Sequence, residues 1–191
     1  MPVVLLRNID TNTKLAIWKM SESLEELLQS RLVIPKNLNR NKRQKEWVCS
    51  RLLLKQIFPN TTINYNQYGA PTLSNGSAVS ISHSHDYCAI LVSNQTAAID
   101  LEFISTKADR LKGQFITKKE EELITEIETS TLIWCAKECL FKIHQQGNIV
   151  FKDDLIVKKI NDKFIETSLK NTAYTLHFEK FENYFLVYYF E

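Results

Sequence analysis

The sequence predicts an α+β fold, and three observations support that class. Segments with the apolar spacing of helices are mixed with segments that alternate like strands. Most of the strand segments follow one another through short turns, so they are expected to pair as antiparallel hairpins. The chain has 191 residues, of which 44% are hydrophobic and 24% charged, as is typical of one globular domain. We therefore expect a single domain over residues 1–191.

The first half of the chain combines strands with two helices. Ser21 is a plausible N-cap for a first helix, and Pro59 ends a second, longer one. Two later strand segments are joined by the polar turn His83-Ser84-His85-Asp86. We expect strands at 3–7, 15–19, 79–82, 87–93 and 96–101, and helices at 21–32 and 39–58.

The second half begins with helices and ends with strands. No Gly or Pro interrupts the helical apolar spacing between Thr131 and Gln146, and Gly147 follows directly. Beyond this glycine the pattern changes to short alternating segments. We expect helices at 118–128 and 131–146, and strands at 155–160, 163–169, 173–178 and 184–190.

Two acids stand at strand spacing in the middle of the chain. The alternation of a strand would place Asp100 and Glu102 on one side and Leu101 on the other. Taken alone, such a pair is more often a solvated face than a site. The interpretation as a site is favoured because a third acid is expected to lie close to this pair.

That third acid comes from the helix expected at 131–146. Trp134, Glu138 and Lys142 recur every four residues, so they share one helix face. Magnesium prefers several carboxylate oxygens and often completes its shell with phosphate oxygens of a substrate. The sequence therefore predicts a Mg²⁺ (or Mn²⁺) site that handles a phosphate, with the two strand acids and Glu138 as ligands.

Four motifs together resemble the Sfp-type 4′-phosphopantetheinyl transferases. That family has Gly-Ile-Asp-x-Glu on a strand and Trp-x-x-Lys-Glu-x-x-x-Lys on a later helix. The matching residues here are Ile99, Asp100, Glu102, Trp134, Lys137, Glu138 and Lys142. Ile81-Ser82-His83-Ser84 matches the family's Ile-Ser-His-Ser segment, and Tyr68-Gly69-Ala70-Pro71 stands where Gly-Lys-Pro is usual. The motifs occur in the family's order.

The resemblance implies two similar α+β halves related by a pseudo-twofold, here 1–95 and 96–191, with the active site in the cleft between them. It also implies transfer of 4′-phosphopantetheine from coenzyme A to a serine of an apo acyl or peptidyl carrier protein. Adenosine 3′,5′-bisphosphate would be released. The expected catalytic residues are Glu138, Lys142 and Asp100, with Glu138 as the base, either directly or through a water.

Coenzyme A would be held by basic and polar groups. By resemblance, His83 contacts its phosphate, with Ser82 nearby and Lys142 as a further donor. A basic cluster around the second helix is either a solvated helix start or a phosphate clamp, and both interpretations stay open. Its members are Lys36, Arg40, Lys42, Arg43 and Lys45. On that helix, Arg43, Trp47 and Arg51 recur every four residues, so this face could meet coenzyme A.

The chain departs from the family pattern at two positions. Ala98 replaces the usual Gly before Ile-Asp, a small change. Ala70 replaces the Lys of Gly-Lys-Pro, which removes a possible phosphate donor, so affinity for coenzyme A is weaker or another cation such as Lys45 compensates. Lys137 points away from the face of Glu138, and we expect it to pair with an acid and hold the helix in place.

Other metal chemistries have weaker support. His83 and His85 form a His-x-His pair that could bind zinc or copper, or could simply cap a turn. Cys135 and Cys139 could share a helix face, but no Cys-x-x-Cys motif is present. We expect the four cysteines, which include Cys49 and Cys88, to be reduced and buried.

Charge and hydropathy exclude several classes of protein. A net charge of +2 does not favour nucleic-acid binding. No apolar run approaches the roughly 18 residues of a membrane span, and the start lacks the features of a signal peptide. We expect a cytoplasmic monomer without membrane contacts. Lys112, Lys118 and Lys119 lie between the metal-bearing segments and either steer an acidic carrier or belong to a solvated loop.

Two other functions are alternatives to the transferase, and the first of them would keep its fold. One is a catalytically silent module that binds coenzyme A or docks a carrier. The other is a divalent-metal phosphohydrolase, in which the same carboxylates would act on water. Intact Glu138 and Lys142 favour the transferase over the silent module.

Overall fold

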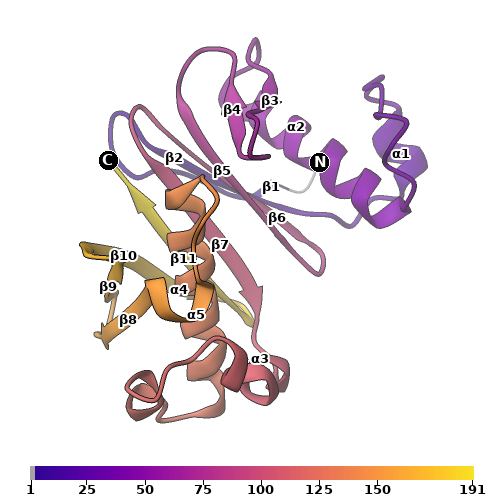
Figure 1. Cartoon of the computed structure of the whole chain (residues 1–191). Helices are drawn as coiled ribbons and strands as arrows, with labels where there is room; N and C mark the ends of the chain where they lie inside the picture. The colour runs from indigo at the N-terminus through magenta and orange to yellow at the C-terminus, as the bar shows by residue number, and fades with distance from the viewer. Residues whose placement is uncertain (1–2) are drawn as a thin grey trace.

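The structure is a computed structural model that describes residues 3–191, and it confirms the α+β class. Within these residues, eleven strands form three sheets and are mixed with five α-helices. Figure 1 shows the two larger sheets one above the other, the first built from the N-terminal part of the chain and the second from the C-terminal part. The chain passes from one to the other at residues 94–96. The pseudo-twofold relation of the halves stays a prediction.

The first sheet has four antiparallel strands in the order β1-β2-β6-β5. They are β1 (Val3–Asn8), β2 (Lys14–Lys19), β5 (Ala78–Ser84) and β6 (Tyr87–Ser93). Helix α2 (Asn41–Ile57) packs on one face of this sheet, and the short α1 (Leu24–Leu28) lies beside α2. Trp18, Leu53 and Ile90 are fully buried in the core between α2 and the sheet. This apolar burial fixes α2 over β2 and β6, next to the neighbouring strand β5.

The second sheet has five antiparallel strands in the order β7-β11-β10-β9-β8. They are β7 (Ala97–Phe103), β8 (Leu155–Ile160), β9 (Phe164–Leu169), β10 (Thr172–Phe181) and β11 (Tyr184–Phe190). Helix α4 (Ile127–His144) packs on one face, with Ala98, Cys135, Cys139 and Val187 in the shared core. The apolar stripe of α4 therefore sets its polar side chains against β7.

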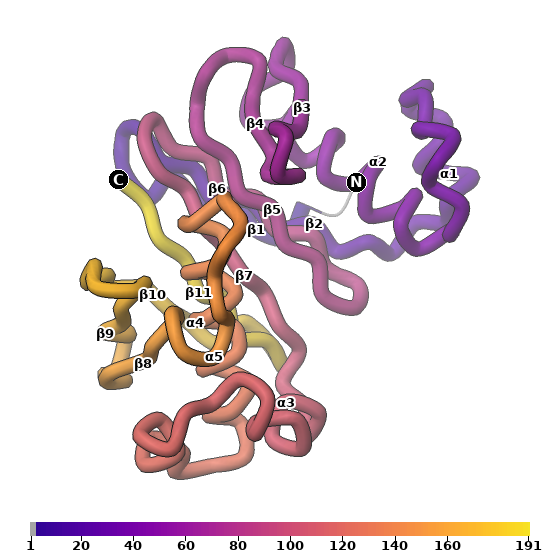
Figure 2. Tube along the Cα trace, viewed as in Figure 1, coloured from indigo at the N-terminus to yellow at the C-terminus, as the bar shows by residue number. Residues whose placement is uncertain are grey.

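A third core joins the two sheets. Leu15, Ile17 and Leu91 come from the first sheet, and Ile99, Leu101 and Leu186 come from the second; all six are fully buried. Strands β5 and β7 run side by side where the sheets meet (Figure 2), with side-chain hydrogen bonds between them. The two parts of the chain thus share an apolar interior rather than meeting through a linker.

Two helix predictions need correction. The first helix covers only Leu24–Leu28, and its N-cap is Ser23 rather than Ser21, because Ser23 and Glu26 form a capping box. The helix expected at 118–128 is wrong. That stretch holds the 3₁₀ turn η2 (Glu120–Leu123), because the Glu120 side chain turns inward instead of facing solvent.

The remaining predicted elements are confirmed with small shifts of their ends. The second long helix begins at Ile127 and ends at His144, where Gln145 adopts a left-handed conformation with φ 51°. The structure adds elements that the periodicity did not predict, namely β3 (Ile63–Tyr65), β4 (Pro71–Leu73), α3 (Thr106–Leu111), η1 (Lys112–Gln114) and α5 (Phe151–Asp154). All four cysteines are buried and unbridged, as expected. Among the helices of residues 3–191, none is both long enough and apolar enough to span a membrane.

Candidate active site

Strand β7 presents its acids as the sequence predicts. Ala98, Asp100 and Glu102 face α4, whereas Leu101 turns into the core between the sheets. From the other side, Trp134 and Lys142 of α4 reach these acids, so the predicted face of the helix meets the predicted face of the strand. Two segments far apart in the sequence therefore converge on one site.

Asp100 is almost fully buried, with 4% of its surface exposed. Its Oδ1 lies 2.8 Å from the Lys142 Nζ and accepts a hydrogen bond from the Ser82 hydroxyl at 2.9 Å. Its Oδ2 is buried and has no hydrogen-bond partner within the described residues. A buried carboxylate oxygen without a partner is costly, so this atom would be stabilised by a ligand.

Glu102 is held on both of its oxygens. Trp134 donates its indole N–H to Oε1 at 3.1 Å, and Ser84 donates its hydroxyl to Oε2 at 3.2 Å. Burial raises the pKa of Glu102 first of all, and the charge of Asp100 raises it further. The two acids of the strand therefore repel each other in the absence of a cation.

Glu138 is the third member of this group. Burial raises its pKa to about 7, the charge of Asp100 adds to the increase, and Lys142 opposes it. A carboxyl with such a pKa takes up and releases a proton near neutral pH. Glu138 is thus suited to act as a general base.

The carboxylates fit a hard divalent cation, although no three metal-ligating side chains of residues 3–191 converge on one ion position in the structure. The donors are all oxygens, as Mg²⁺ and Mn²⁺ prefer. Asp100 Oδ2 has no hydrogen-bond partner in the described part of the chain, and a bound cation would give it one interaction. A positive charge would also offset the repulsion by Asp100 that, after burial, raises the pKa of Glu102 and of Glu138. Asp100, Glu102 and Glu138 are therefore the residues that would hold such an ion.

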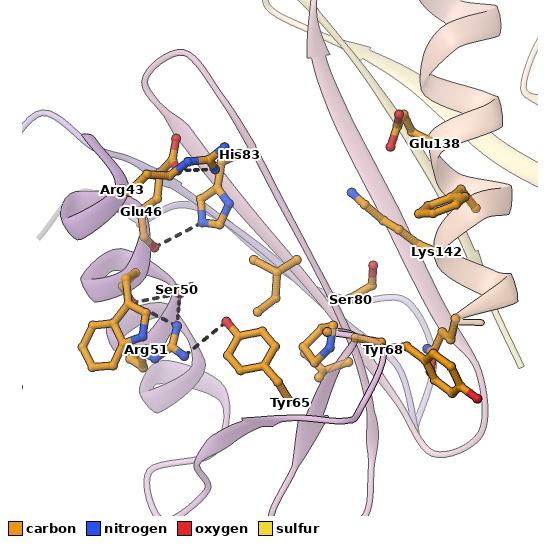
Figure 3. Close-up of a pocket in the computed structure, with 18 of the residues that line it drawn as sticks. Arg43, Glu46, Ser50, Arg51, Tyr65, Tyr68, Ser80, His83, Glu138 and Lys142 are labelled. Carbon is orange, nitrogen blue, oxygen red and sulfur yellow. Dashed lines mark hydrogen bonds and ion pairs between the residues drawn. The ribbon is translucent and has the colours of Figure 1, made fainter. Parts of the chain in front are cut away.

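A cavity of about 590 Å³ opens beside Glu138 and is lined by both parts of the chain, whereas Asp100 and Glu102 do not line it. In Figure 3, Glu138 and Lys142 project from α4, whereas Arg43, Arg51 and His83 stand on the opposite side. Pro71 and the residues before it close one end. The cavity therefore places cationic groups around a space large enough for a nucleotide-sized ligand.

His83 of β5 lies on the α2 side of the cavity, next to Glu46 (Figure 3). Its Nε2 lies 3.1 Å from the backbone carbonyl oxygen of Glu46 on α2. Burial lowers the pKa of His83 to about 4, and the charges of Lys142, Arg43 and Arg51 add to the decrease. His83 is therefore neutral at pH 7 in this environment, and an anion nearby would favour its charged form.

Helix α2 supplies the residues predicted to face coenzyme A. Arg43, Trp47 and Arg51 all line the cavity. The Arg51 guanidinium stacks 4.1 Å from the centre of the Trp47 ring and donates to the Tyr65 hydroxyl at 3.3 Å. Arg43 forms an ion pair of 2.9 Å with the buried Glu46. Of the basic cluster, only Arg43 is among the cavity-lining residues.

The expectation that Lys45 compensates for Ala70 is wrong in this structure. Lys45 does not line the cavity, because its Nζ donates to the Met20 carbonyl oxygen at 3.2 Å, on another side of α2. Ala70 itself lines the cavity. The position that holds a lysine in the family therefore faces the cavity here too, but without a charge. Arg51, in contrast to Lys45, is a cation that lines the same cavity as Ala70.

Three further residues differ from the simplest expectation. Ser82 is buried and does not line the cavity, because its hydroxyl is engaged with β7. His85 lies in the β5–β6 turn with φ 49°, packed 4.5 Å from the Phe103 ring and outside the cavity. Lys137 is fully buried and pairs with Glu120 at 2.9 Å, which confirms that it holds the helix in place.

Sequence reasoning predicted Trp47 but assigned no role to the two tyrosines of the cavity. Tyr65 and Tyr68 line it from β3 and the turn before β4. The available signal was their position, since Tyr68 directly precedes the Gly69-Ala70-Pro71 segment and Tyr65 stands four residues before Gly69. Two tyrosines beside a phosphate-binding motif are well placed to stack on a base.

One comparison bears on these observations. Residues 33–93 match the family model described as the 4′-phosphopantetheinyl transferase N-terminal domain. The matched stretch contains α2, the Gly69-Ala70-Pro71 turn and His83. Over these residues the chain is therefore similar to the phosphopantetheinyl transferases. The match ends before β7 and α4, so Asp100, Glu102 and Glu138 lie outside it. No individual curated protein matches the chain.

Proposed function

We propose that this protein is a phosphopantetheinyl transferase that moves the 4′-phosphopantetheine group from coenzyme A to a serine of an apo acyl or peptidyl carrier protein, with Mg²⁺ or Mn²⁺. The observation that carries the proposal is the position of the cavity. It is lined by Arg43, Arg51, His83 and Lys142, and its Glu138 is electrostatically coupled to Asp100 and Glu102. A diphosphate ester needs donors along its phosphates and a cation at the reacting phosphorus.

The protein groups divide this task between them. Arg43, Arg51 and His83 would bind the phosphates at the nucleotide end, because guanidinium groups and imidazole donate to phosphate oxygens. Tyr65 and Tyr68 would lie against the base. Lys142 would donate to the diphosphate while holding Asp100 in place. The cation held by the three acids would offset the charge of the diphosphate.

Proton transfer falls to Glu138. The serine oxygen of the carrier forms a bond to the phosphorus that bears pantetheine, and the bond from that phosphorus to the other phosphate of coenzyme A breaks. Glu138 would take the serine proton, directly or through a water, and adenosine 3′,5′-bisphosphate would leave with the bonding electron pair. A base with a pKa near neutrality suits this step at physiological pH.

Intact mass spectrometry tests the proposal. The full chain is incubated with coenzyme A, Mg²⁺ and either an apo acyl or an apo peptidyl carrier protein. We expect one phosphopantetheine adduct on the carrier, no adduct when EDTA replaces Mg²⁺, and none with Asp100→Ala or Glu138→Ala. Glu102→Ala should reduce transfer less than these two changes. Both Glu102 oxygens already accept hydrogen bonds from the protein, and a water or substrate oxygen can take its place at the metal.

The same experiment separates the other functions. A silent module would bind coenzyme A and leave both coenzyme and carrier unchanged. A phosphohydrolase would cleave coenzyme A without modifying the carrier. Near-normal transfer by both Asp100→Ala and Glu138→Ala would contradict the assignment of these residues.

A further inference from the structure

Strands β5 and β7 meet through serine side chains. Serine occupies every second position of β5 from Ser80 to Ser84, so the three hydroxyls share one side of the strand. Each accepts a backbone N–H of β7: Ser80 from Ile99 at 2.9 Å, Ser82 from Leu101 at 3.1 Å and Ser84 from Phe103 at 3.1 Å. These three hydrogen bonds join the two sheets. We call this row the seam, and each serine with its N–H partner a rung.

Each hydroxyl still has a proton to donate. A serine hydroxyl offers one proton and two lone pairs, and the backbone N–H occupies only a lone pair. Ser82 donates its proton to Asp100 Oδ1 at 2.9 Å, and Ser84 donates to Glu102 Oε2 at 3.2 Å. In both cases the acid directly precedes the residue whose N–H is bound.

The third rung shows the same geometry without an acid. Ser80 binds the N–H of Ile99, and the residue before it is Ala98, which offers no carboxylate. The seam therefore consists of two rungs that contact acids and one that does not. This arrangement provides a matched control within the chain.

We propose that Ser84 is a positioning residue for Glu102, as Ser82 is for Asp100, so that the seam between the sheets sets where the two strand acids stand. Ser84 is 7% exposed, so solvent does not readily substitute for its hydroxyl. Ser84 holds one oxygen of Glu102 from the first sheet, and Trp134 holds the other from α4. Groups that orient a metal-ligating carboxylate affect metal affinity without touching the ion.

The test measures metal binding directly, and it rests on the proposed function. Mn²⁺ is titrated into the full chain without coenzyme A, because the control residue Ser80 lines the cavity, and free Mn²⁺ is followed by electron paramagnetic resonance. We expect Ser84→Ala to weaken Mn²⁺ binding by about 10-fold. Ser84→Thr, which keeps the hydroxyl, should restore most of the affinity. Ser80→Ala should lower the thermal midpoint in a similar way and leave the Mn²⁺ affinity unchanged.

A double-mutant cycle distinguishes positioning from a general loss of stability. In a Glu102→Ala background, Ser84→Ala should no longer change Mn²⁺ affinity, because the carboxylate that it orients is gone. If Ser84→Ala does not fold, Ser84→Cys takes its place, since a thiol is a weak donor of similar shape. Equal Mn²⁺ affinities for the Ser80 and Ser84 variants would overturn the proposal, as would an undiminished Ser84 effect without Glu102.

The failure of the proposed function would look different. It would appear as a wild-type chain that neither binds Mn²⁺ nor modifies either carrier. The positioning role alone fails if the wild type does both while the Ser84 and Ser80 variants behave alike.

Discussion

The Lys142 Nζ lies 2.8 Å from Asp100 Oδ1 and 2.7 Å from the carbonyl oxygen of Ile99, so one ammonium group ties α4 to the strand that bears the acids. Asp100 is buried, and burial alone disfavours its charge. The Lys142 ammonium group therefore stabilises the structure in addition to its proposed role in catalysis.

Lys142→Met tests this pairing. Removing one partner of a buried pair costs about 3–5 kcal/mol, and we expect roughly 2 kcal/mol here because the Lys142 side chain keeps a quarter of its exposure. Urea denaturation measures the change. Lys180→Met is the matched control, since Lys180 pairs with Glu128 at the same 2.8 Å but on the surface. Equal losses for the two variants would contradict this stabilising role.

Glu138 should make the metal-free protein sensitive to pH. Because its pKa is raised to about 7 in the folded state, protonation favours folding; that contribution is fully present below pH 4.5 and is lost as pH rises through about 7. The upper bound is about 3 kcal/mol, since one pKa unit corresponds to about 1.4 kcal/mol.

Glu138→Gln mimics the protonated acid and should remove this loss. We expect the variant and the wild type to have similar stability at pH 4 and the variant to be the more stable at pH 8 in EDTA. Denaturation curves at several pH values measure the difference. A stability difference that does not change with pH would show that Glu138 is not held in a strained ionised state.

His83 should titrate far below an ordinary histidine. Its pKa of about 4 is caused first by burial and then by Lys142, with smaller effects of Arg43 and Arg51. In NMR titrations of the imidazole, Lys142→Met should raise this pKa without restoring it fully, because burial remains. Adenosine 3′,5′-bisphosphate should raise it too. Binding would then take up protons, so affinity for the nucleotide should increase as pH falls.

His177 provides the internal reference for that titration. Burial alone lowers its pKa, and it lies on β10, stacked on Tyr188 away from the cavity. Neither Lys142→Met nor the nucleotide should move it. A parallel shift of both histidines would indicate a global change instead of a phosphate contact at His83.

The elements that sequence predicted well have strong periodicity. The face carrying Trp134, Glu138 and Lys142 follows from helical spacing alone, and the alternation around Asp100 and Glu102 follows from the strand. Both patterns are local, so neighbouring residues suffice to read them. The α+β class follows from the same local patterns.

What sequence reasoning could not supply depends on distant contacts. Glu120 belongs to a run of three acids that resembles an exposed helix start, yet it is buried because Lys137 lies 2.9 Å away. The choice of Ser23 over Ser21 as N-cap, by contrast, follows from a local pattern that the sequence contains, since Ser23 and Glu26 stand three residues apart and form a capping box. The contacts of Ser84 depend on the packing of β5 against β7. The alternation of side chains within either strand does not predict that packing.

Carrier docking gives the last prediction. Lys118 and Lys119 are exposed in the turn before η2, whereas Lys112 is paired with Asp109 at 3.0 Å, so the first two are the freer cations of this loop. If they steer an acidic carrier, replacing both by Glu should raise the KM for the carrier several-fold. The KM for coenzyme A should hardly change, because neither lysine lines the cavity.

The effect should also shrink with salt, because exposed charges are screened over about 8 Å at physiological ionic strength. The control exchanges Lys158 and Lys163 for Glu, two exposed lysines at the β8–β9 edge of the second sheet, opposite β7. This pair of changes alters the net charge by the same amount and should leave the carrier KM unaltered. Equal increases for both double variants would mean that net charge, and not a docking surface around Lys118, governs the encounter with the carrier.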